Sequence, residues 1–476
     1  MRMIQGRIGT DGVAHSRHTA LRPTFCARWV ALALRTVLTA LTALITVVES
    51  PEARSQDSAS SLPVSMPAGT TYEVVDAFPG LRFPPGRDDI LGLTSPPRRT
   101  NELFATGQNG TVLVITNLAE PTRSVFLDLT DRTFRGAPSI EPGLVGLAFH
   151  PQYDLNRQFF VFYTRTNSAT RKMYDTLSRF ETDPANPARA LASSEKILFS
   201  QVDVWPERQG GDLQFGPDGY LYVSLGDGGG HGGILNSQRI DKDFFSGILR
   251  IDVDGRTGSL APHPHAALGT GYRIPPDNPF VGARSFMGKS VVPGAIRTEF
   301  WAVGLRNPFR MAFDSLTGEL YTADVGEVRV EEINRIVRGG NYGWNFLEGQ
   351  SPHSGARPLA GTLRPPLFQY GHAATDQGVH GKAVIGGMVY RGPRYPGLQG
   401  KYLFADYASR QVVALNLNGT GKATASVLAT TPRGITGFAI HPLTGEILMV
   451  ERDGGRIVKI VDRSEDLPKA APEPSP

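Results

Sequence analysis

The sequence predicts an all-β fold, a six-bladed β-propeller in which each blade is a four-stranded antiparallel sheet. The chain has 54 glycines and 36 prolines among 476 residues, a composition typical of many short strands joined by tight turns. No helical period persists between residues 71 and 462, and one hairpin pattern returns six times in that range. Six such hairpins, with further strand-like runs between them, match the radial repetition of four-stranded sheets. An array of β-sandwiches is the alternative, disfavoured because no linker of distinct composition separates the repeats.

Most copies of the hairpin pattern share one design. An apolar strand is followed by a turn such as Pro-Asp-Gly or Leu-Thr-Gly and then by a second strand of alternating character. Glycine in these turns supplies the positive φ angle that a tight hairpin requires. We expect hairpins at residues 102–115, 146–163, 213–223, 311–324, 400–415 and 438–451. The widest interval between strands, residues 254–298, is loop-rich and is expected on one rim.

The two ends of the chain differ from the propeller region, which we expect to occupy residues 71–462. Residues 1–57 are predicted to be a secretory signal peptide followed by a disordered segment, because an arginine-rich stretch precedes a 13-residue apolar run at 36–48. A membrane span needs about 20 apolar residues. An uncleaved anchor is the alternative, since residues 30–48 are apolar apart from Arg35. Residues 463–476 are expected to be a disordered tail.

The export signal, the cysteine usage and the charge together restrict the protein's class. The single cysteine, Cys26, lies inside the predicted signal region, so the mature chain has no disulfide and no thiol chemistry. We therefore expect a periplasmic or secreted protein with no membrane span in its mature chain. A net charge of +4 without a basic block gives no reason to expect a nucleic-acid partner. The glycine cluster at 226–233 follows a hairpin strand instead of opening a helix, so it is read as a blade loop and not as a phosphate cradle.

Two loops carry groups suited to an anionic ligand or a cation. In Gly304–Arg310, Arg306 could bind a carboxylate in bidentate fashion with Asn307 beside it, or could simply bond loop carbonyls. Residues 323–336 place four carboxylates within nine residues around a glycine turn. Such oxygen donors are what hard cations bind, although a solvated acidic loop has the same pattern. A third loop, residues 389–396, adds cationic groups beside aromatic residues.

Several motifs in these regions resemble one known family. They are G-L-V-G-L-A-F-H-P, G-G-D-L-Q-F-G-P-D-G-Y-L-Y-V-S-L-G-D, G-L-R-N-P-F-R-M-A-F and E-E-I-N-R-I-V-R-G-G-N-Y-G-W. From about residue 78 to residue 461 the chain resembles the soluble PQQ-dependent glucose/sorbosone (aldose sugar) dehydrogenases. The resemblance implies a six-bladed propeller that oxidises the anomeric carbon of an aldose sugar to a lactone. It also implies that hydride passes to pyrroloquinoline quinone (PQQ), a tricarboxylate bridged by Ca²⁺, and then to an electron acceptor such as a cytochrome or a quinone.

The resemblance also assigns roles to individual residues. Arg306 would polarise the quinone carbonyl, and Asn307 and Glu141 would lie on the cofactor side of the site. Arg391 and Arg410 would meet the cofactor carboxylates. Calcium would be bound by Gly326 and Glu327 through backbone oxygens, with Glu331 and Tyr342 nearby.

One position departs from the family pattern. The family has a histidine, which takes the sugar hydroxyl proton, two residues before the Gly-Gly pair that opens the L-Q-F-G-P-D-G strand. Here that position is Arg208. Because arginine stays protonated in proteins, it cannot act as this base. Three explanations remain open: His231 substitutes as the base, the propeller binds a sugar or a partner without turnover, or the site is degenerate.

Overall fold

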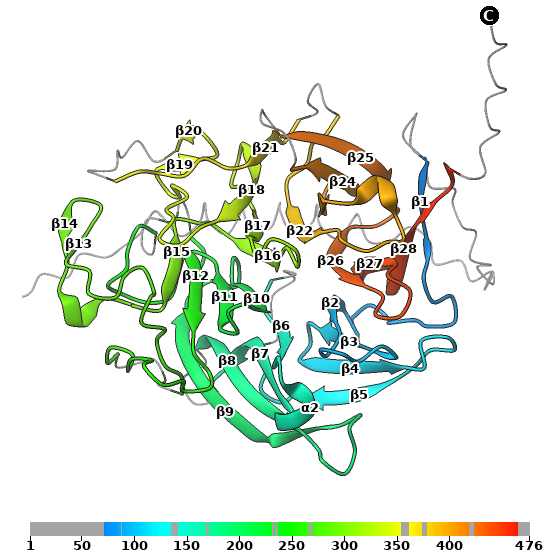
Figure 1. The fold of residues 1–476 in the computed structure, drawn as a ribbon, viewed down its shortest axis with the longest axis horizontal. Helices are drawn as coiled ribbons and strands as arrows, with labels where there is room; N and C mark the ends of the chain where they lie inside the picture. The colour runs from blue at the N-terminus through cyan, green and yellow to red at the C-terminus, as the bar shows by residue number, and fades with distance from the viewer. Residues whose placement is uncertain are drawn as a thin grey trace, which may run out of the picture. The chain divides into compact units, whose positions relative to one another are not determined.

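The computed structural model describes residues 71–464 apart from 87, 135–140, 168–169, 171, 231–232, 234–236, 266–268, 270, 354–360, 374–377 and 418–422. Figure 1 shows six sheets arranged in a ring. Each sheet has four antiparallel strands, which confirms the predicted six-bladed propeller. The predicted signal segment, residues 1–57, and almost all of the predicted tail lie outside the described residues.

The strands of each blade run outward from the channel in the following order. Blade 1 has β2 (Ile90–Thr94), β3 (Glu102–Gly107), β4 (Thr111–Thr116) and β5 (Thr122–Asp128). Blade 2 has β6 (Leu144–Phe149), β7 (Gln158–Thr166), β8 (Met173–Thr182) and β9 (Ala190–Asp203). Blade 3 has β10 (Gly210–Phe215), β11 (Leu221–Leu225), β12 (Gly247–Ile251) and β15 (Phe300–Val303).

The other three blades follow the same plan. Blade 4 has β16 (Pro308–Phe313), β17 (Leu320–Asp324), β18 (Val330–Ile336) and β21 (Phe368–Gly371). Blade 5 has β22 (Val384–Val389), β23 (Lys401–Asp406), β24 (Gln411–Asn416) and β25 (Thr424–Thr430). Blade 6 has β26 (Ile435–Ile440), β27 (Ile447–Glu451), β28 (Arg456–Asp462) and β1 (Tyr72–Asp76).

The six predicted hairpins are all present. They are the antiparallel pairs β3–β4, β6–β7, β10–β11, β16–β17, β23–β24 and β26–β27. The ring closes where the first described strand, β1, pairs with β28 from Tyr72↔Asp462 to Asp76↔Val458. Figure 1 shows β1 and β28 side by side at that closure. Hydrogen bonds between the two ends of the propeller therefore hold the ring shut.

Neighbouring blades pack their apolar faces against each other. Between blades 1 and 2, the ring of Phe149 contacts that of Phe104 edge-on at a centroid distance of 4.7 Å. Offset or edge-on aromatic pairs of this kind add to the stability gained from burying their area. The alternating apolar residues that predicted the strands therefore fill the spaces between blades.

The first strand of each blade lines the channel, and each of these six strands carries a register shift. In β6 the shift falls at Gly146, where an added Cβ would lie 2.0 Å from the carbonyl oxygen of Gly211 in the next blade. A side chain there would force the inner strands apart. Glycine holds the corresponding position in β2 and β26, at Gly92 and Gly437, whereas β16 has Arg310.

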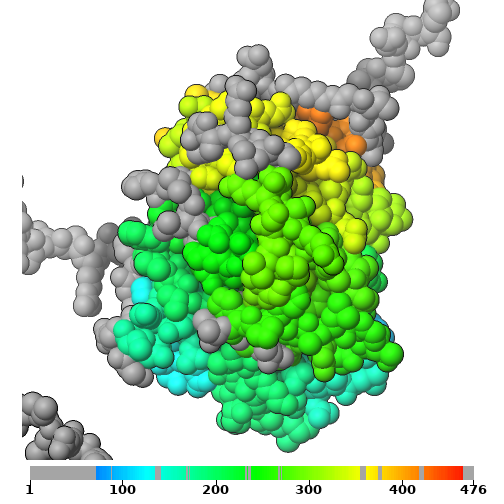
Figure 2. All heavy atoms as spheres, turned by 90° about the vertical axis from the view of Figure 1, so that its left-hand side faces the viewer, coloured from blue at the N-terminus to red at the C-terminus, as the bar shows by residue number. Residues whose placement is uncertain are grey.

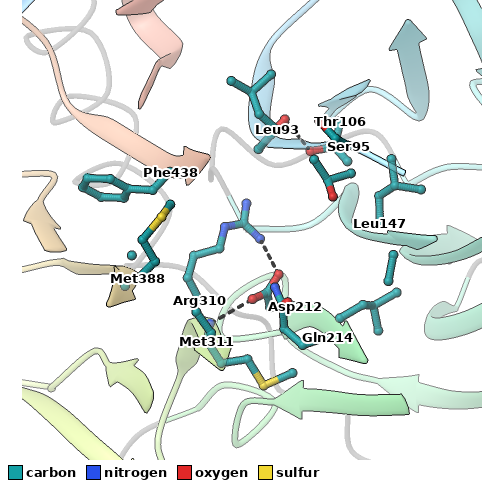
Figure 3. A pocket seen from close by; sticks show the side chains of 18 of the residues that line it. Leu93, Ser95, Thr106, Leu147, Asp212, Gln214, Arg310, Met311, Met388 and Phe438 are labelled. Atoms are coloured by element: carbon teal, nitrogen blue, oxygen red, sulfur yellow. Dashed lines mark hydrogen bonds and ion pairs between the residues drawn. The ribbon is translucent and has the colours of Figure 1, made fainter. Parts of the chain in front are cut away.

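Arg310 is buried, and its side chain extends across the channel to the inner strands of other blades. Its guanidinium donates to the carbonyl oxygens of Val145 (2.9 Å), Leu91 (3.1 Å) and Thr436 (3.3 Å), and it lies 3.7 Å from a carboxylate oxygen of Asp212. Figure 3 shows Arg310 and Asp212 pointing toward one another. One side chain thus joins the inner strands of five blades.

A cavity of about 340 Å³ lies in the channel at and beyond the level of Arg310, toward the ends of the inner strands. Its lining includes Ser95, Met388 and Phe438 (Figure 3). Arg310 is among the residues that line it.

The predicted loop-rich insertion lies between β12 and β15. It contains the two-residue strands β13 (Ser285–Phe286) and β14 (Lys289–Ser290). Figure 2 turns the left-hand side of Figure 1 toward the viewer, and there green residues of this part of the chain cover the middle of the surface. Two further short strands, β19 (Leu347–Glu348) and β20 (Ser351–Pro352), pair beyond β18. The one short α-helix among the described residues is α2 (Tyr153–Asn156). No helix within the described ranges is long and apolar enough to cross a membrane.

Candidate functional site

The candidate site lies where the inner strands β2, β6, β10, β16, β22 and β26 begin, which we call the site face. The loops that enter β6, β10 and β16 carry Glu141, Arg208 and the pair Arg306–Asn307. The structure brings these four residues together although up to 166 positions separate them in sequence. They come to one place because the first strands of adjacent blades run side by side.

Asn307 links two of these loops. Its side-chain nitrogen donates to a carboxylate oxygen of Glu141 at 3.3 Å, and its side-chain oxygen accepts from the backbone N–H of Gly210 at 3.2 Å. Glu141 also accepts a hydrogen bond from the backbone N–H of Arg208. Burial raises the pKa of Glu141 above its usual range. Asn307 is 3% exposed, so this network fixes the spacing of blades 2, 3 and 4 at the site face.

Arg208 is held from several sides. Its Nε lies 3.0 Å from Asp227 Oδ1, and another guanidinium nitrogen donates to the carboxylate of Glu207 at 3.1 Å. It also donates to the carbonyl oxygen of Gly230. Its φ angle of 63° lies in the left-handed region, which residues other than glycine seldom adopt. The guanidinium is therefore a fixed charge at the position where the resemblance expects a base.

Arg306 lies at the centre of the group. Its backbone N–H donates to the carboxylate of Asp324 at 2.9 Å, and its guanidinium donates to the carbonyl oxygen of Val325 at 3.0 Å. The guanidinium also lies over the ring of Trp344, 5.5 Å from its centroid. Its Nε atom is buried without a hydrogen-bond partner among the described residues. Arg306 thus keeps a donor unused at the site, and it acts electrostatically on both Glu141 and Asp227.

A groove of about 610 Å³ opens beside Arg208 on the site face. It is lined by Trp205, Glu207, Arg208, Gly230, Glu327, Val328 and His353. His353 Nε2 lies 2.7 Å from Glu327 Oε2, and its Nδ1 lies 3.3 Å from the carbonyl oxygen of Asn345. Both ring nitrogens therefore face oxygen atoms, and neither presents a lone pair to the groove.

The sequence analysis missed three residues of this site: Asp227, Trp344 and His353. Asp227 accepts from the indole N–H of Trp344 at 2.8 Å as well as pairing with Arg208, and His353 lines the groove. Asp227 stands in the glycine cluster, and Trp344 stands in the N-Y-G-W motif. A charged residue inside a glycine-rich loop was the available signal for Asp227, whereas nothing in the local sequence distinguished His353.

The loop expected to bind calcium turns its amides toward a carboxylate. Oε1 of Glu348 accepts the backbone N–H groups of Glu327 (2.9 Å), Val328 (2.8 Å) and Arg329 (2.8 Å). This arrangement fixes the loop before β18. In the part of the chain that the structure describes, no three His, Cys, Asp or Glu side chains gather so as to hold a metal ion.

Glu331, expected near the calcium, bonds to the protein instead. Its Oε2 accepts from the backbone N–H of Val384 at 3.1 Å and from that of Gly326 at 3.3 Å, and its Oε1 lies 3.1 Å from His372 Nε2. Burial raises the pKa of Glu331 to about 8. The carboxylate of Glu331 is therefore bound by the protein itself, whereas calcium binding by the backbone oxygens of Gly326 and Glu327 stays a prediction.

Tyr342 lies away from the loop that the resemblance paired with it. Its hydroxyl donates to the carbonyl oxygen of Arg335 at 2.7 Å and accepts from the N–H of Val337 at 2.9 Å, at the last residues of β18. Glu327 precedes the first residue of β18. A strand rises about 3.3 Å per residue, so the hydroxyl lies roughly 20 Å along β18 from that loop. Tyr342 is a core residue, 3% exposed, and the expected metal role is corrected accordingly.

Arg391 also lies elsewhere. It follows the end of β22 and forms a two-point ion pair with Asp314, with distances of 2.8 and 2.6 Å. Asp314 follows the end of β16, so this pair lies on the opposite face from Arg306. Inner strands begin on the site face and end on the opposite face. A residue that follows an inner strand therefore cannot reach a site on the face where that strand begins. The expected contact of Arg391 with a cofactor carboxylate is corrected on this ground.

Arg410 is exposed on the site face, where it donates to the carbonyl oxygen of Pro432 at 3.1 Å. Lys382 and Arg433 are exposed on the same side, just before β22 and β26. Lys382 and Arg306 both act electrostatically on His372. Lysine and arginine side chains such as these are of the kind that binds a planar polycarboxylate such as PQQ. His231, the candidate substitute base, lies outside the described residues.

Comparisons with known proteins give one family. The model of the Glucose / Sorbosone dehydrogenase family matches residues 96–459. The chain is 29% identical over 370 residues to the HIPL1 protein of Arabidopsis thaliana, covering 67% of this chain and 51% of that protein. It is 25% identical over 397 residues to the Hedgehog-interacting protein of Mus musculus, covering 77% of this chain and 50% of that protein. The chain therefore spans about half the length of these curated relatives.

The fold has solved counterparts. The PQQ-bound form of aldose sugar dehydrogenase from Streptomyces coelicolor superimposes with a TM-score of 0.57 at 20% identity, covering 83% of this chain and 99% of that one. At this identity the likeness shows the propeller fold alone.

Proposed function

The chain belongs to the Glucose / Sorbosone dehydrogenase family, and from this premise we propose that it is an exported sugar-binding propeller that lacks the family's proton-abstracting base. The observation that carries the proposal is the buried guanidinium of Arg208, paired with Asp227 at 3.0 Å. A group that stays protonated cannot take the proton of a sugar hydroxyl as hydride leaves. Loss of a positioned general base costs about 10²–10⁴-fold in rate.

The groove beside Arg208 suits a sugar. Carboxylates of Glu207 and Glu327 can accept hydrogen bonds from sugar hydroxyls, and the indole of Trp205 at the same groove offers an apolar face. Trp205 is 48% exposed, so it is accessible to a ligand. Arg208 itself adds donors for a ring or hydroxyl oxygen.

A quinone cofactor fits the neighbouring cations. Arg306 and Asn307, with Lys382, Arg410 and Arg433, would hold PQQ by its carbonyl and carboxylate oxygens. When bound, PQQ supplies an acceptor for hydride. The residues of this chain would bind and orient the cofactor. Arg306 is anchored for this by the carbonyl of Val325 and the ring of Trp344. Arg208 occupies the position of the base that takes the sugar proton in the family.

One relative supports a binding role, because its printed name, Hedgehog-interacting protein, describes interaction with another molecule. Two others, named Aldose sugar dehydrogenase YliI and Quinoprotein glucose dehydrogenase B, support the second candidate below. Because the chain spans about half of the Hedgehog-interacting protein, only the propeller is compared. The proposal concerns a sugar ligand, and no protein partner is assigned.

The second candidate is PQQ-dependent oxidation of an aldose to its lactone, with electrons passed to a cytochrome or a quinone. His353 favours it, because an imidazole paired with Glu327 lines the same groove as Arg208. For His353 to act as a base, its Nε2 would have to leave Glu327. This candidate therefore requires a rearrangement that the sugar-binding proposal does not.

The two candidates are separated by adding PQQ, Ca²⁺ and a panel of aldoses to the purified protein and measuring both binding and reduction of an artificial acceptor. We expect binding of a sugar by calorimetry and no turnover, whereas R208H should gain activity by up to about two orders of magnitude. Turnover by the wild-type protein that His353→Ala abolishes would establish the second candidate instead. Absence of sugar binding in the wild-type protein would overturn the proposal.

A further inference from the structure

Blade 2 contains a buried row of polar side chains. Thr164 of β7, Asp175 of β8 and Gln201 of β9 are directly paired across the three strands, so their side chains lie on the same face of the sheet. Asp203, two residues after Gln201, lies on that face as well. None of the four is more than 2% exposed.

This row contains two carboxyl groups in contact. Burial and the neighbouring Asp203 raise the pKa of Asp175, and burial raises the pKa of Asp203 to about 7. No lysine or arginine among the described residues forms an ion pair with either. Two like charges in contact are costly in an apolar interior unless a positive charge or a shared proton offsets them.

Several oxygens around the pair lack hydrogen-bond partners among the described residues. They are both carboxylate oxygens of Asp175, the hydroxyl of Thr164 and the amide oxygen of Gln209. The amide nitrogen of Gln209 donates to Asp203 at 3.3 Å, which places the side chain of Gln209 beside the same carboxylate. A proton shared by the two carboxyl groups involves one oxygen of Asp175 and leaves its second oxygen to the neighbouring hydroxyl of Thr164.

We propose that Asp175 and Asp203, with the neutral oxygens of Thr164 and Gln209, bind a hard divalent cation of the Ca²⁺ class. Two carboxylates match its charge, and the neutral side-chain oxygens supply the further ligands that such an ion takes. These groups come from β7, β8, β9 and the loop after β9, and all are buried. The amide of Gln209, whose nitrogen donates to Asp203, would turn its oxygen toward the cation. This site is in blade 2 and is separate from the loop between β17 and β18.

The cation would support the segment that carries Arg208. Asp203 accepts from the backbone N–H of Trp205 at 3.1 Å, and Gln209 donates to the carbonyl oxygen of Trp205 at 2.9 Å. Residues 203–209 thus fold around the acidic pair. Trp205, Glu207 and Arg208 of this segment line the sugar groove, so occupancy of the cation site sets the position of that wall.

The test compares thermal midpoints of the purified protein in excess EDTA and in millimolar Ca²⁺, without PQQ or sugar. Binding to the native state alone raises the midpoint, and we expect a rise of a few °C. Asp175→Asn keeps the size of the side chain and removes one charge, so it should abolish the rise while being at least as stable as the wild-type protein in EDTA. Asp241→Asn, a partly exposed aspartate in the loop between β11 and β12, is the matched control and should retain the full rise.

Further variants make each result decisive. Glu331→Gln, in β18 next to the loop that the family resemblance assigns to calcium, should retain the rise. Loss of the rise in that variant would instead place the cation at that loop. Thr164→Val should weaken Ca²⁺ binding about tenfold by equilibrium dialysis, and this readout holds even where Asp175→Asn folds poorly. No rise in the wild-type protein, or an undiminished rise in Asp175→Asn, would overturn the proposal.

Discussion

Nε of Arg208 lies 3.0 Å from Oδ1 of Asp227, and the two side chains are 7% and 0% exposed. The carboxylate of Asp227 also accepts from the indole of Trp344. This ion pair joins the loop entering β10 to the loop leaving β11, and it fixes a cation in the groove. A buried ion pair of this kind stabilises a protein little compared with two apolar side chains in the same place. Removal of one partner alone is costly, because it leaves the other charge buried and uncompensated.

Substitution of Asp227 by asparagine should therefore destabilise the protein strongly. We expect the free energy of unfolding to fall by about 3 kcal/mol, because Arg208 stays buried and charged. Urea denaturation measures the change. Asp241→Asn is the control, since Asp241 pairs with Arg239 at 3.1 Å on the surface and its loss should cost less than about 1 kcal/mol. Equal effects of the two substitutions would contradict the burial argument.

Arg310 offers a second test of buried charge. Arg310→Met should lower the free energy of unfolding by about 3–5 kcal/mol, because three carbonyl oxygens lose their donor and Asp212 loses its cation. The double variant with Asp212→Asn should recover part of this loss, since the carboxylate no longer needs a counter-charge. Strictly additive effects in the double-mutant cycle would rule out coupling between these two residues.

The propeller could be predicted because its information is local and repeated. Turn residues such as Gly219 and Gly318, with φ angles of 76° and 72°, mark the hairpins directly in the sequence. The pairing of β1 with β28 could not be read in this way. It joins residues almost 400 positions apart. Nothing in the seven residues of β28 specifies β1 as the partner strand instead of another exposed strand.

The site was predictable only in part, for a geometric reason. Glu141, Arg208, Arg306 and Asn307 all precede inner strands, and that shared position brings them to one face. Arg391 follows an inner strand, and a motif of arginines and aromatics does not reveal on which side of its strand it lies. Asp175 was missed because a single acidic residue within an apolar strand gives no sign of the carboxyl group that the fold sets beside it.

The pair Arg391–Asp314 leads to a prediction on acid stability. The hydrogen bond from Arg391 lowers the pKa of Asp314 from 3.8 to about 2, and the Asp314 side chain is 1% exposed. Because the folded-state pKa is depressed, the stabilisation is fully present above pH 3.8 and is lost as the pH falls through 2. Because the N–H of Leu316 and the hydroxyl of Thr317 supply part of this depression, Arg391→Met should cost about 1 kcal/mol near neutral pH and nothing measurable near pH 2.

Denaturant unfolding of the wild-type protein and Arg391→Met across the acid range measures this difference. The same variant should leave the binding of sugar and PQQ unchanged, because Arg391 lies on the face opposite to the site. A loss of PQQ affinity in Arg391→Met would show that the two faces communicate, against the geometry described above.

Trp205 provides the most direct test of the sugar groove. Its side chain is 48% exposed beside Arg208, so truncation to alanine removes an aromatic face without opening the core. We expect Trp205→Ala to weaken sugar binding by about 10–100-fold, in line with the loss of an aromatic anchor at a binding site. Its thermal midpoint should change little. Leu316→Ala is the control, because Leu316 is 73% exposed in the turn after β16, on the opposite face. Calorimetric titration of both variants decides the matter, and unchanged sugar affinity in Trp205→Ala would place the ligand elsewhere than in this groove.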